Sequence, residues 1–200
     1  MAGCRKINNY SVRGKAFTPV DSIQYLISNE VVATTQTVLK EYSHLQPASE
    51  GIVYWAGKKL ENTCLITAVI APDAMATPFN ITIGHQANAK VVEFLCDTGL
   101  IHLGQVHTHP GKWVGHSLTD DRAAAFKCQG LLSIVVPDFC TNTMLPLIKC
   151  GIHRYENDAF MRLSKTYVNK HFAVTENSLE FVFQDFRVDY YEQVRLVNQA

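Results

Sequence analysis

The chain of 200 residues is 47% hydrophobic and 18% charged, an ordinary globular composition that is long enough for one domain with a full core. Its 18 basic and 18 acidic residues cancel, so we expect no broad nucleic-acid-binding surface. No apolar run approaches the ~20 residues that span a bilayer, and we expect no membrane partner.

The first twenty residues predict an irregular or short-strand lead-in, without the apolar core of a secretory signal. A helix is expected to begin at Asp21 or Ser22, because both are good N-caps and follow Pro19. It is expected to end near residue 45, before Pro47. Its apolar face would consist of Ile23, Ile27, Val31, Val38, Tyr42 and Leu45.

Two strands are expected next, at about 51–57 and 63–71, joined by a polar turn. Residues 72–84 contain proline and glycine and predict a loop with room for a short strand. A second helix follows, and it is expected to stop near Gly99. Its apolar face would consist of Ala87, Val91, Phe94 and Leu95.

The second half of the chain continues the alternation of strands and helices. We expect a buried strand at 100–106, a loop at 110–117, a helix to about Cys128, strands at about 132–137 and 145–155, a short helix near 160–171 and a strand at 180–188. This order predicts a single α/β domain over residues 1–200, with a mixed sheet between helices. Its core would cover about 20–155, followed by a C-terminal extension at about 156–200.

Cysteine usage indicates a cytoplasmic protein. None of the six cysteines forms a C-x-x-C pair, and most lie in apolar stretches. We therefore expect buried thiols in a reducing compartment. The six are Cys4, Cys64, Cys96, Cys128, Cys140 and Cys150.

The most informative stretch is His107-x-His109-Pro110-x6-Ser117-x-x-Asp120. Side chains alternate along a strand, so the two imidazoles would leave the strand from the same side. Pro110 cannot donate to a sheet ladder and is expected to end the strand. Asp120 begins an acidic pair, which is typical of the first turn of a helix. One strand end and one helix start could therefore place three ligands around an ion.

Two neutral imidazoles and one carboxylate suit a borderline cation, with zinc the best fit. Three protein ligands leave a fourth position for water, which is the catalytic rather than the structural arrangement. Zinc lowers the pKa of such a water to roughly 7. The Ser117 hydroxyl could cap the helix that carries Asp120, and it could also donate to an oxyanion forming on a substrate carbonyl. A general base is absent from this window.

These residues resemble the signature of the JAMM metalloproteases, also called MPN-plus or JAB-domain proteins. The sequence around the motif is most similar to the bacterial, deubiquitinase-like branch. The resemblance implies a zinc peptidase with an α/β MPN fold, a cytidine-deaminase-like three-layer arrangement. One zinc ion per chain would be held by His107, His109 and Asp120, with Ser117 as the oxyanion donor.

In this family the general base is a glutamate near the start of an early strand, and the matching position here is Glu50. Gly57, seven residues later, fits the family pattern, whereas Val53 stands where many relatives have glycine. Competing acids, Glu41 and Glu61, are interpreted as solvated surface charges.

The resemblance also implies a substrate. Many JAMM enzymes cleave the bond after the C-terminal glycine of ubiquitin or a ubiquitin-like protein, either to deconjugate it or to mature a precursor. The expected partners are a ubiquitin-like protein or its conjugates, and ubiquitin-activating-like and ubiquitin-conjugating-like proteins of a bacterial pathway. An extended tail could add as a strand to a sheet edge beside the metal.

Three other functions are alternatives to this one. The substrate could instead be a sulfur-carrier protein, or the chain could be a non-catalytic MPN scaffold, although its ligand set is complete. A zinc nucleoside deaminase is rejected, because Thr108 stands where that family has glutamate and no Pro-Cys-x-x-Cys occurs. His116 is expected near the metal but not on it, and Trp113 could either pack or line a substrate groove.

Overall fold

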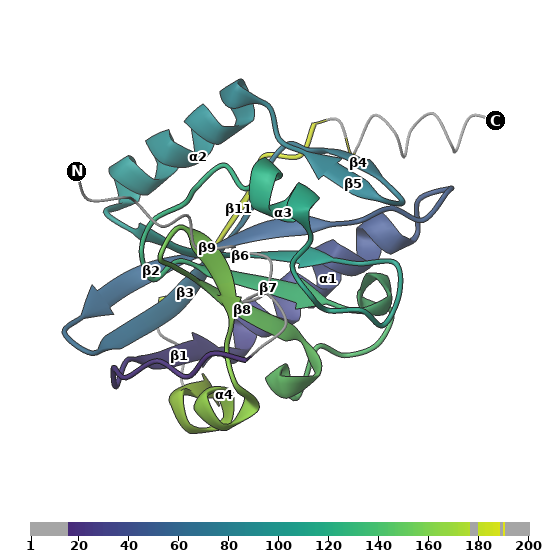
Figure 1. Ribbon diagram of the computed structural model, residues 1–200. Helices are drawn as coiled ribbons and strands as arrows, with labels where there is room; N and C mark the ends of the chain where they lie inside the picture. The colour runs from purple at the N-terminus through teal and green to yellow at the C-terminus, as the bar shows by residue number, and fades with distance from the viewer. Residues whose placement is uncertain (1–15, 177–179, 189, 191–200) are drawn as a thin grey trace, which may run out of the picture.

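The computed structural model describes residues 16–176, 180–188 and 190, which form one large mixed sheet with helices on both sides (Figure 1). In chain order the elements are β1 (Gln24–Ser28), α1 (Asn29–Ser43), β2 (Ile52–Leu60), β3 (Thr63–Ala71), β4 (Met75–Thr77), β5 (Asn80–Thr82), α2 (His85–Thr98), β6 (Ile101–Thr108), α3 (Leu118–Ala123), β7 (Leu132–Val136), β8 (Gly151–Glu156), β9 (Ala159–Arg162), α4 (Lys165–His171), β10 (Phe172–Thr175) and β11 (Val182–Asp185).

The sheet runs in the order β10-β1-β3-β2-β6-β7-β8-β9, and β11 pairs with β3 beside β1. The pairs β1–β3, β1–β10, β3–β11 and β6–β7 are parallel, and the others are antiparallel. The expected α/β architecture with a mixed sheet is therefore confirmed. β4 and β5 form a separate antiparallel pair.

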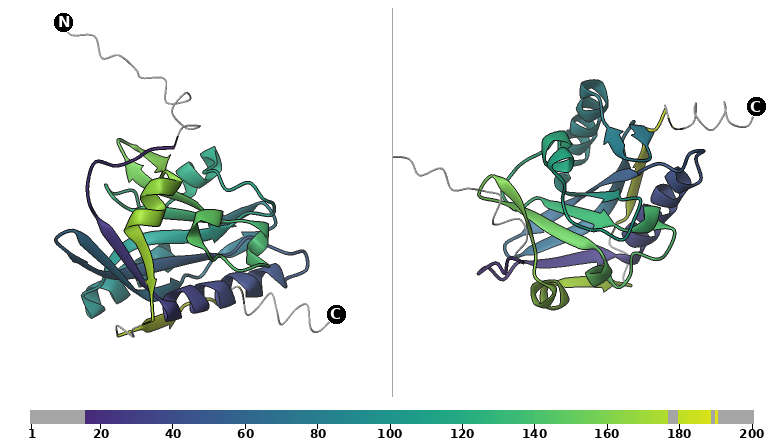
Figure 2. Two further views of the ribbon diagram at one scale, coloured as in Figure 1. Left: turned by 90° about the horizontal axis from the view of Figure 1, so that it is seen from below. Right: turned by 45° about the vertical axis from the view of Figure 1, so that its right-hand side comes forward.

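Alternate residues of β2 divide the apolar interior into two layers. Val53 and Trp55 belong to a cluster with α1 residues, whereas Ile52 and Tyr54 belong to a cluster with Val91 of α2. Figure 1 shows α2 and α3 above the sheet and α4 below it, and Figure 2 shows α1 running along the sheet. The sheet is thus covered on both faces.

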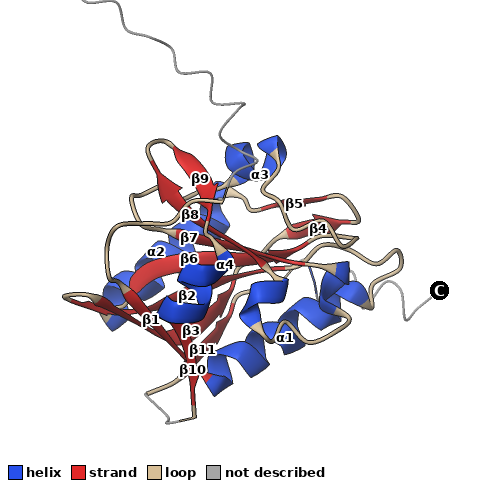
Figure 3. Cartoon of the chain, turned by 60° about the horizontal axis from the view of Figure 1, so that its bottom comes forward, coloured by secondary structure: helices blue, strands red, loops and turns tan. Residues whose placement is uncertain are grey.

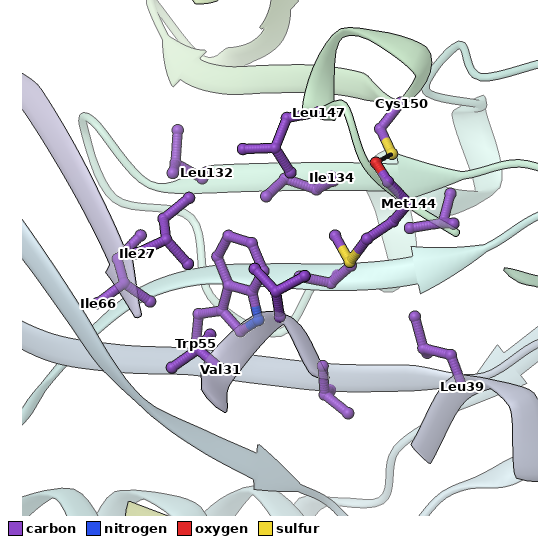
Figure 4. Close-up of a cluster of buried hydrophobic side chains, with 14 of the residues drawn as sticks. Ile27, Val31, Leu39, Trp55, Ile66, Leu132, Ile134, Met144, Leu147 and Cys150 are labelled. Atoms are coloured by element: carbon purple, nitrogen blue, oxygen red, sulfur yellow. Dashed lines mark hydrogen bonds between the residues drawn. The ribbon is translucent and has the colours of Figure 1, made fainter. Parts of the chain in front are cut away.

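The α1-side core is built around Trp55, which is fully buried (Figure 4). Its indole Nε1 donates to Thr35 Oγ1 of α1 over 2.8 Å, so the one polar atom of the ring is satisfied inside the core. Ile134 of β7 and Met144 pack in the same cluster. This packing holds α1 against the centre of the sheet.

The expected start of the first helix at Asp21 or Ser22 is wrong. Residues Gln24–Ser28 form β1, in which Tyr25 and Ile27 are buried. The helix begins after Ser28, whose hydroxyl accepts the Val31 N–H over 3.3 Å as its N-cap. The spacing of apolar residues also fits a strand, and pairing with β3 and β10 on both sides decides between the two.

Three later boundaries also differ from expectation. The helix expected to reach Cys128 ends at Ala123, because Phe126 packs edge-on against Tyr54 and His102 instead. The strand expected from residue 145 begins at Gly151, after a 3₁₀ turn that follows a cis peptide bond before Pro146.

The helix expected near 160–171 is confirmed only from Lys165 onward, with Ser164 as its N-cap. Residues Ala159–Arg162 form β9 instead. The two-residue turn before it, Asn157 and Asp158, has φ values of 50° and 65°, which Asn and Asp tolerate well. This turn closes a tight hairpin with β8.

The expected positions of β2, β3, α2, β6 and β7 are confirmed within a few residues. α2 ends at Gly99, which has a φ of 66°. The expected C-terminal extension contributes to the sheet itself: β10 pairs with β1, and β11 pairs with β3 along residues that β1 leaves unpaired. Among the described residues after 155, Leu163, Tyr167 and Val168 are therefore part of the core.

The cysteine expectation holds for only part of the set. Cys64, Cys140 and Cys150 are buried thiols, but Cys96 and Cys128 are exposed. Cys4 lies outside the described residues. Within the part of the chain that the structure describes, no helix combines the length and apolar character needed to cross a bilayer.

Gly57 offers a test of the sheet geometry. A Cβ atom at this position would lie 1.8 Å from the Leu65 carbonyl oxygen, so Gly57→Ala is expected to destabilise the fold by about 3 kcal/mol. The matched control is Gly84→Ala, where a Cβ would meet nothing within 4 Å and less than about 1 kcal/mol is expected. Urea unfolding measures both, and equal stability of the two variants would contradict the close approach.

Candidate metal centre

The end of β6 and the start of α3 bring the signature residues together. His107 lies near the end of β6, and His109 follows one residue after the strand. Asp120 lies in the first turn of α3. Because β6 alternates its side chains, both imidazoles leave from the same side, and their ring centres are 5.1 Å apart.

The three side chains form a compact ligand set. Asp120 Oδ2 lies 3.4 Å from His109 Nε2 and 3.8 Å from His107 Nε2. All three candidate ligand atoms lie within 4.8 Å of one another. His107 and His109 are buried, and the Asp120 side chain is 15% exposed. A search of the described residues for side chains that could hold a metal ion together identifies this group.

The hydrogen bonding of the imidazoles fits a metal ion. His107 is buried, and neither of its ring nitrogens has a hydrogen-bond partner. His109 Nδ1 lies 3.1 Å from the Trp113 carbonyl oxygen, which can only accept. Nδ1 therefore carries the proton, and Nε2 is left with a free lone pair facing Asp120.

The electrostatics favour a positive charge between the three groups. Burial lowers the pKa of His107, which keeps this imidazole neutral. Burial acts in the same direction on His109, but the Asp120 carboxylate outweighs it, so the pKa of His109 is raised. Burial would raise the pKa of Asp120, yet the two histidines hold it well below its usual range. A cation placed between the three groups, whether a proton or a metal ion, would be stabilised by the Asp120 carboxylate.

Ser117 and Asp120 form a capping box at the start of α3. Ser117 Oγ accepts the Asp120 N–H over 3.0 Å, and the Ser117 N–H donates to Asp120 Oδ2 over 2.6 Å. The same Oδ2 atom faces the two imidazoles. The cap therefore fixes the direction of the carboxylate.

Glu50 lies in the same cavity as His107 and Asp120. The cavity has a volume of about 30 Å³, which is enough for a water molecule or an ion. Strand register explains the meeting: Ile52 of β2 pairs with His107 of β6, and Glu50, two residues earlier, shares the face of Ile52. The Glu50 N–H donates to the Thr77 carbonyl oxygen over 2.9 Å, which holds its backbone in place.

The environment of Glu50 makes it a weak acid. Burial raises its pKa to about 7, the Asp120 carboxylate acts in the same direction, and His109 opposes both. A carboxyl with a pKa near neutrality can both accept and return a proton at physiological pH.

A strained turn supports the end of β6. Asp138, Phe139 and Cys140 have φ values of 52°, 51° and 58°, which aspartate tolerates but which are unfavourable for Phe139 and Cys140. In this conformation the Phe139 N–H donates to the His109 carbonyl oxygen over 2.8 Å, and the Asp138 N–H donates to that of Gly111 over 3.1 Å. The turn thus holds the backbone that carries His109.

The loop between the ligands lies directly on the sheet. A Cβ at Gly151 of β8 would lie 1.7 Å from the Val114 carbonyl oxygen, so only glycine permits this approach. Trp113 stacks on His109 with ring centres 5.2 Å apart, yet it is 60% exposed. It therefore both packs and presents an aromatic surface beside the site, the two roles that its sequence position left open.

The competing residues lie elsewhere or have other partners. Both ring nitrogens of His116 are hydrogen-bonded, to Asp121 and Ser133, as expected for a histidine beside the ligands. Glu41 pairs with the buried Arg187 over 2.7 Å, so its interpretation as a solvated charge is incomplete. Glu61 is exposed.

Sequence reasoning missed several residues of the cavity. Gln105 could have been found, because it lies two residues before His107 and shares its face of β6. The segment from Asn80 to Ile83 gave no such signal, since only the folded hairpin β4–β5 brings it over the cavity. Figure 3 shows this hairpin on the same side of the sheet as α3.

Comparison with known proteins agrees with this geometry. The chain is 30% identical over 121 residues to the probable metalloprotease y4jG of Sinorhizobium fredii, and the match covers 56% of this chain and 70% of that protein. The chain belongs to the family of this metalloprotease. This relative and the His107–His109–Asp120 group together support a metal-dependent hydrolase.

The fold also resembles a solved structure. Protein DSY2949 from Desulfitobacterium hafniense superposes with a TM-score of 0.58, over 78% of this chain and 96% of that one, at 14% sequence identity. A likeness at this identity concerns the fold alone. No family profile matches the chain.

The ligand set can be tested by metal content. Purified protein given Zn²⁺ is expected to hold about one ion per chain, and His109→Ala should lose it. Asp120→Asn is the sharper variant, because its side-chain oxygen can still cap α3 while the ligand charge is gone. The control is His85→Ala, which removes an exposed histidine of α2. Full zinc content in His109→Ala would rule out this site.

Proposed function

We propose that this protein is a zinc-dependent peptidase of the JAMM (MPN-plus) type that cleaves after the C-terminal glycine of a ubiquitin-like protein. The observation that carries the proposal is the position of Glu50 in one cavity with His107 and Asp120. A metal ligand set alone would also suit a structural site, but a buried carboxyl beside it is what hydrolysis requires.

Zinc fits the three ligands best among the common cations. Two neutral imidazoles and a carboxylate match its usual donors, and three protein ligands leave one position open. Bound there, zinc would polarise a substrate carbonyl and make water a better nucleophile at neutral pH. His107, His109 and Asp120 would hold it, with Nε2 of each imidazole turned toward Asp120.

Glu50 is the proposed general base and acid. Its carboxylate would take a proton from the attacking water and return it to the nitrogen of the departing amine. Both steps need a group that changes protonation state easily, which its burial provides. The hydrogen bond to the Thr77 carbonyl oxygen holds the backbone of Glu50 in place.

Ser117 is the proposed oxyanion donor. Its Oγ accepts the Asp120 N–H, so its own hydroxyl hydrogen is left to donate to oxygen on a substrate carbonyl. Capping and oxyanion stabilisation therefore use different parts of the same hydroxyl group. The cap would orient the donor before substrate arrives.

The surroundings suit an extended tail. Large apolar side chains stand exposed near the site, on the hairpin β4–β5, the ligand loop and α3: Met75, Phe79, Trp113 and Leu118. A peptide could add as a strand to an edge of the two-stranded β4–β5 sheet. Glycine at the scissile position would let the backbone approach closely.

A cleavage panel tests both the chemistry and the substrate. Zinc-loaded protein is expected to cleave fusions of ubiquitin-like proteins at their terminal glycine, and Glu50→Gln should reduce kcat by at least about 100-fold without loss of zinc. Glu61→Gln, at an exposed acid, is the control. If only sulfur-carrier fusions are cleaved, the proposed substrate is replaced by a sulfur-carrier protein. If Glu50→Gln leaves the cleavage rate unchanged, the general-base role of Glu50 is refuted.

The proposal also predicts the acid side of the pH profile. Glu50 must be ionised to accept a proton, and its pKa of about 7 places the loss of activity on the acid side of pH 7. A cation bound beside Glu50 lowers this pKa, so the midpoint of the pH profile of kcat/KM should lie at or below pH 7. Rates measured at constant ionic strength would show it. A profile flat down to pH 4.5 would contradict this assignment.

A further inference from the structure

The helix that carries Asp120 cannot hold itself in place. α3 has only six residues, and isolated helices of that length are unstable in water. Leu118, its one large apolar residue, is 40% exposed. Burial of Leu118 therefore does little to anchor α3, and another interaction is needed to fix the ligand that this helix supplies.

His116 provides a connection between α3 and the sheet. Its side chain is only 3% exposed. Nδ1 lies 2.8 Å from Asp121 Oδ1, and Nε2 lies 2.9 Å from Ser133 Oγ of β7. Asp121 follows the ligand Asp120 directly in α3, so the imidazole links the first turn of the helix to the centre of the sheet.

The sheet beneath His116 presents a row of polar residues in register. Gln105 of β6 pairs with Ser133 of β7, which pairs with His153 of β8. Gln105 Nε2 donates to Ser133 Oγ over 3.1 Å. Gln105 also shares the face of the ligand His107 and lines the same cavity. The row therefore connects the two elements that carry metal ligands.

The proton positions in this network are mutually consistent. The Asp121 carboxylate can only accept, so Nδ1 of His116 carries the proton. Nε2 of the same ring can then accept from the Ser133 hydroxyl, which in turn accepts from Gln105. Every member has its partner, which is the condition under which a buried polar network specifies one geometry.

Aromatic packing fixes the ring itself. His116 stacks on Phe160 of β9, with ring centres 4.5 Å apart and an interplanar angle of 27°. It also lies against His153, at 5.3 Å between ring centres. With contacts on both of its nitrogens and on its face, the imidazole has little freedom to turn.

We propose that His116 is a positioning residue, which holds α3 so that the Asp120 carboxylate faces the two ligand imidazoles. This inference rests on the proposed metal site and adds to it a residue that does not touch the metal. Loss of His116 would leave the three ligands present but would let α3 shift on the sheet, and metal affinity would fall.

The test measures Zn²⁺ affinity by competition with a chromophoric chelator, together with the visible absorption of the Co²⁺-loaded protein. His116→Leu is expected to weaken Zn²⁺ binding about 10- to 100-fold and to change the Co²⁺ spectrum. Asp121→Ala should act similarly, and the double variant should be little weaker than either single one, because both break the same link. His116→Gln, which keeps hydrogen-bonding atoms, should recover part of the affinity.

The control separates positioning from general destabilisation. Val168→Ala removes buried volume in α4, away from the network, so it should lower the unfolding temperature and leave the Zn²⁺ affinity unchanged. If the wild type binds one Zn²⁺ and His116→Leu has a Zn²⁺ affinity within about twofold of it and the same Co²⁺ spectrum, this inference is overturned while the proposed function stands. Absence of Zn²⁺ binding by the wild type would overturn the proposed function and the inference together.

Discussion

The register of β6 between β2 and β7 is the constraint on which the site depends. Pairing of Ile52 with His107 puts Glu50 on the face of the ligand imidazole, although the two are far apart in sequence. Pairing of Gln105 with Ser133 puts a polar row beneath the ligand loop. A shift of β6 by one residue would turn His107 and Gln105 to the α1 face, where the interior is apolar.

The same sheet divides its two faces between different tasks. The face toward α1 is an apolar interior built around Trp55, whose burial gives the fold its stability. The face toward α2 and α3 carries Glu50, His107 and Gln105, and apolar residues such as Ile52 and Ile81 share the lining of the cavity with them. Buried ionisable groups cost stability, and the packed opposite face offsets that cost.

Several locally unfavourable or restrictive features lie around the ligand loop. The left-handed turn at Asp138–Cys140 is strained, yet its N–H groups hold the backbone at His109. Because Gly151 has no side chain, the Val114 carbonyl oxygen can lie close to the backbone of β8. Together with the capping box at Ser117, these features orient the ligands without using the ligands themselves.

The spacing of His107, His109, Ser117 and Asp120 was sufficient to predict one ligand set, because the periods of a strand and of a helix start act over a few residues. Short-range patterns also predicted β2, β3, α2, β6 and β7. They failed at β1, because residues 23–27 fit two periods and pairing with distant strands decided between them. The raised pKa of Glu50 and the contact of His116 with Ser133 arise between residues 17 to 70 positions apart in the chain, from register and burial that only the tertiary structure sets.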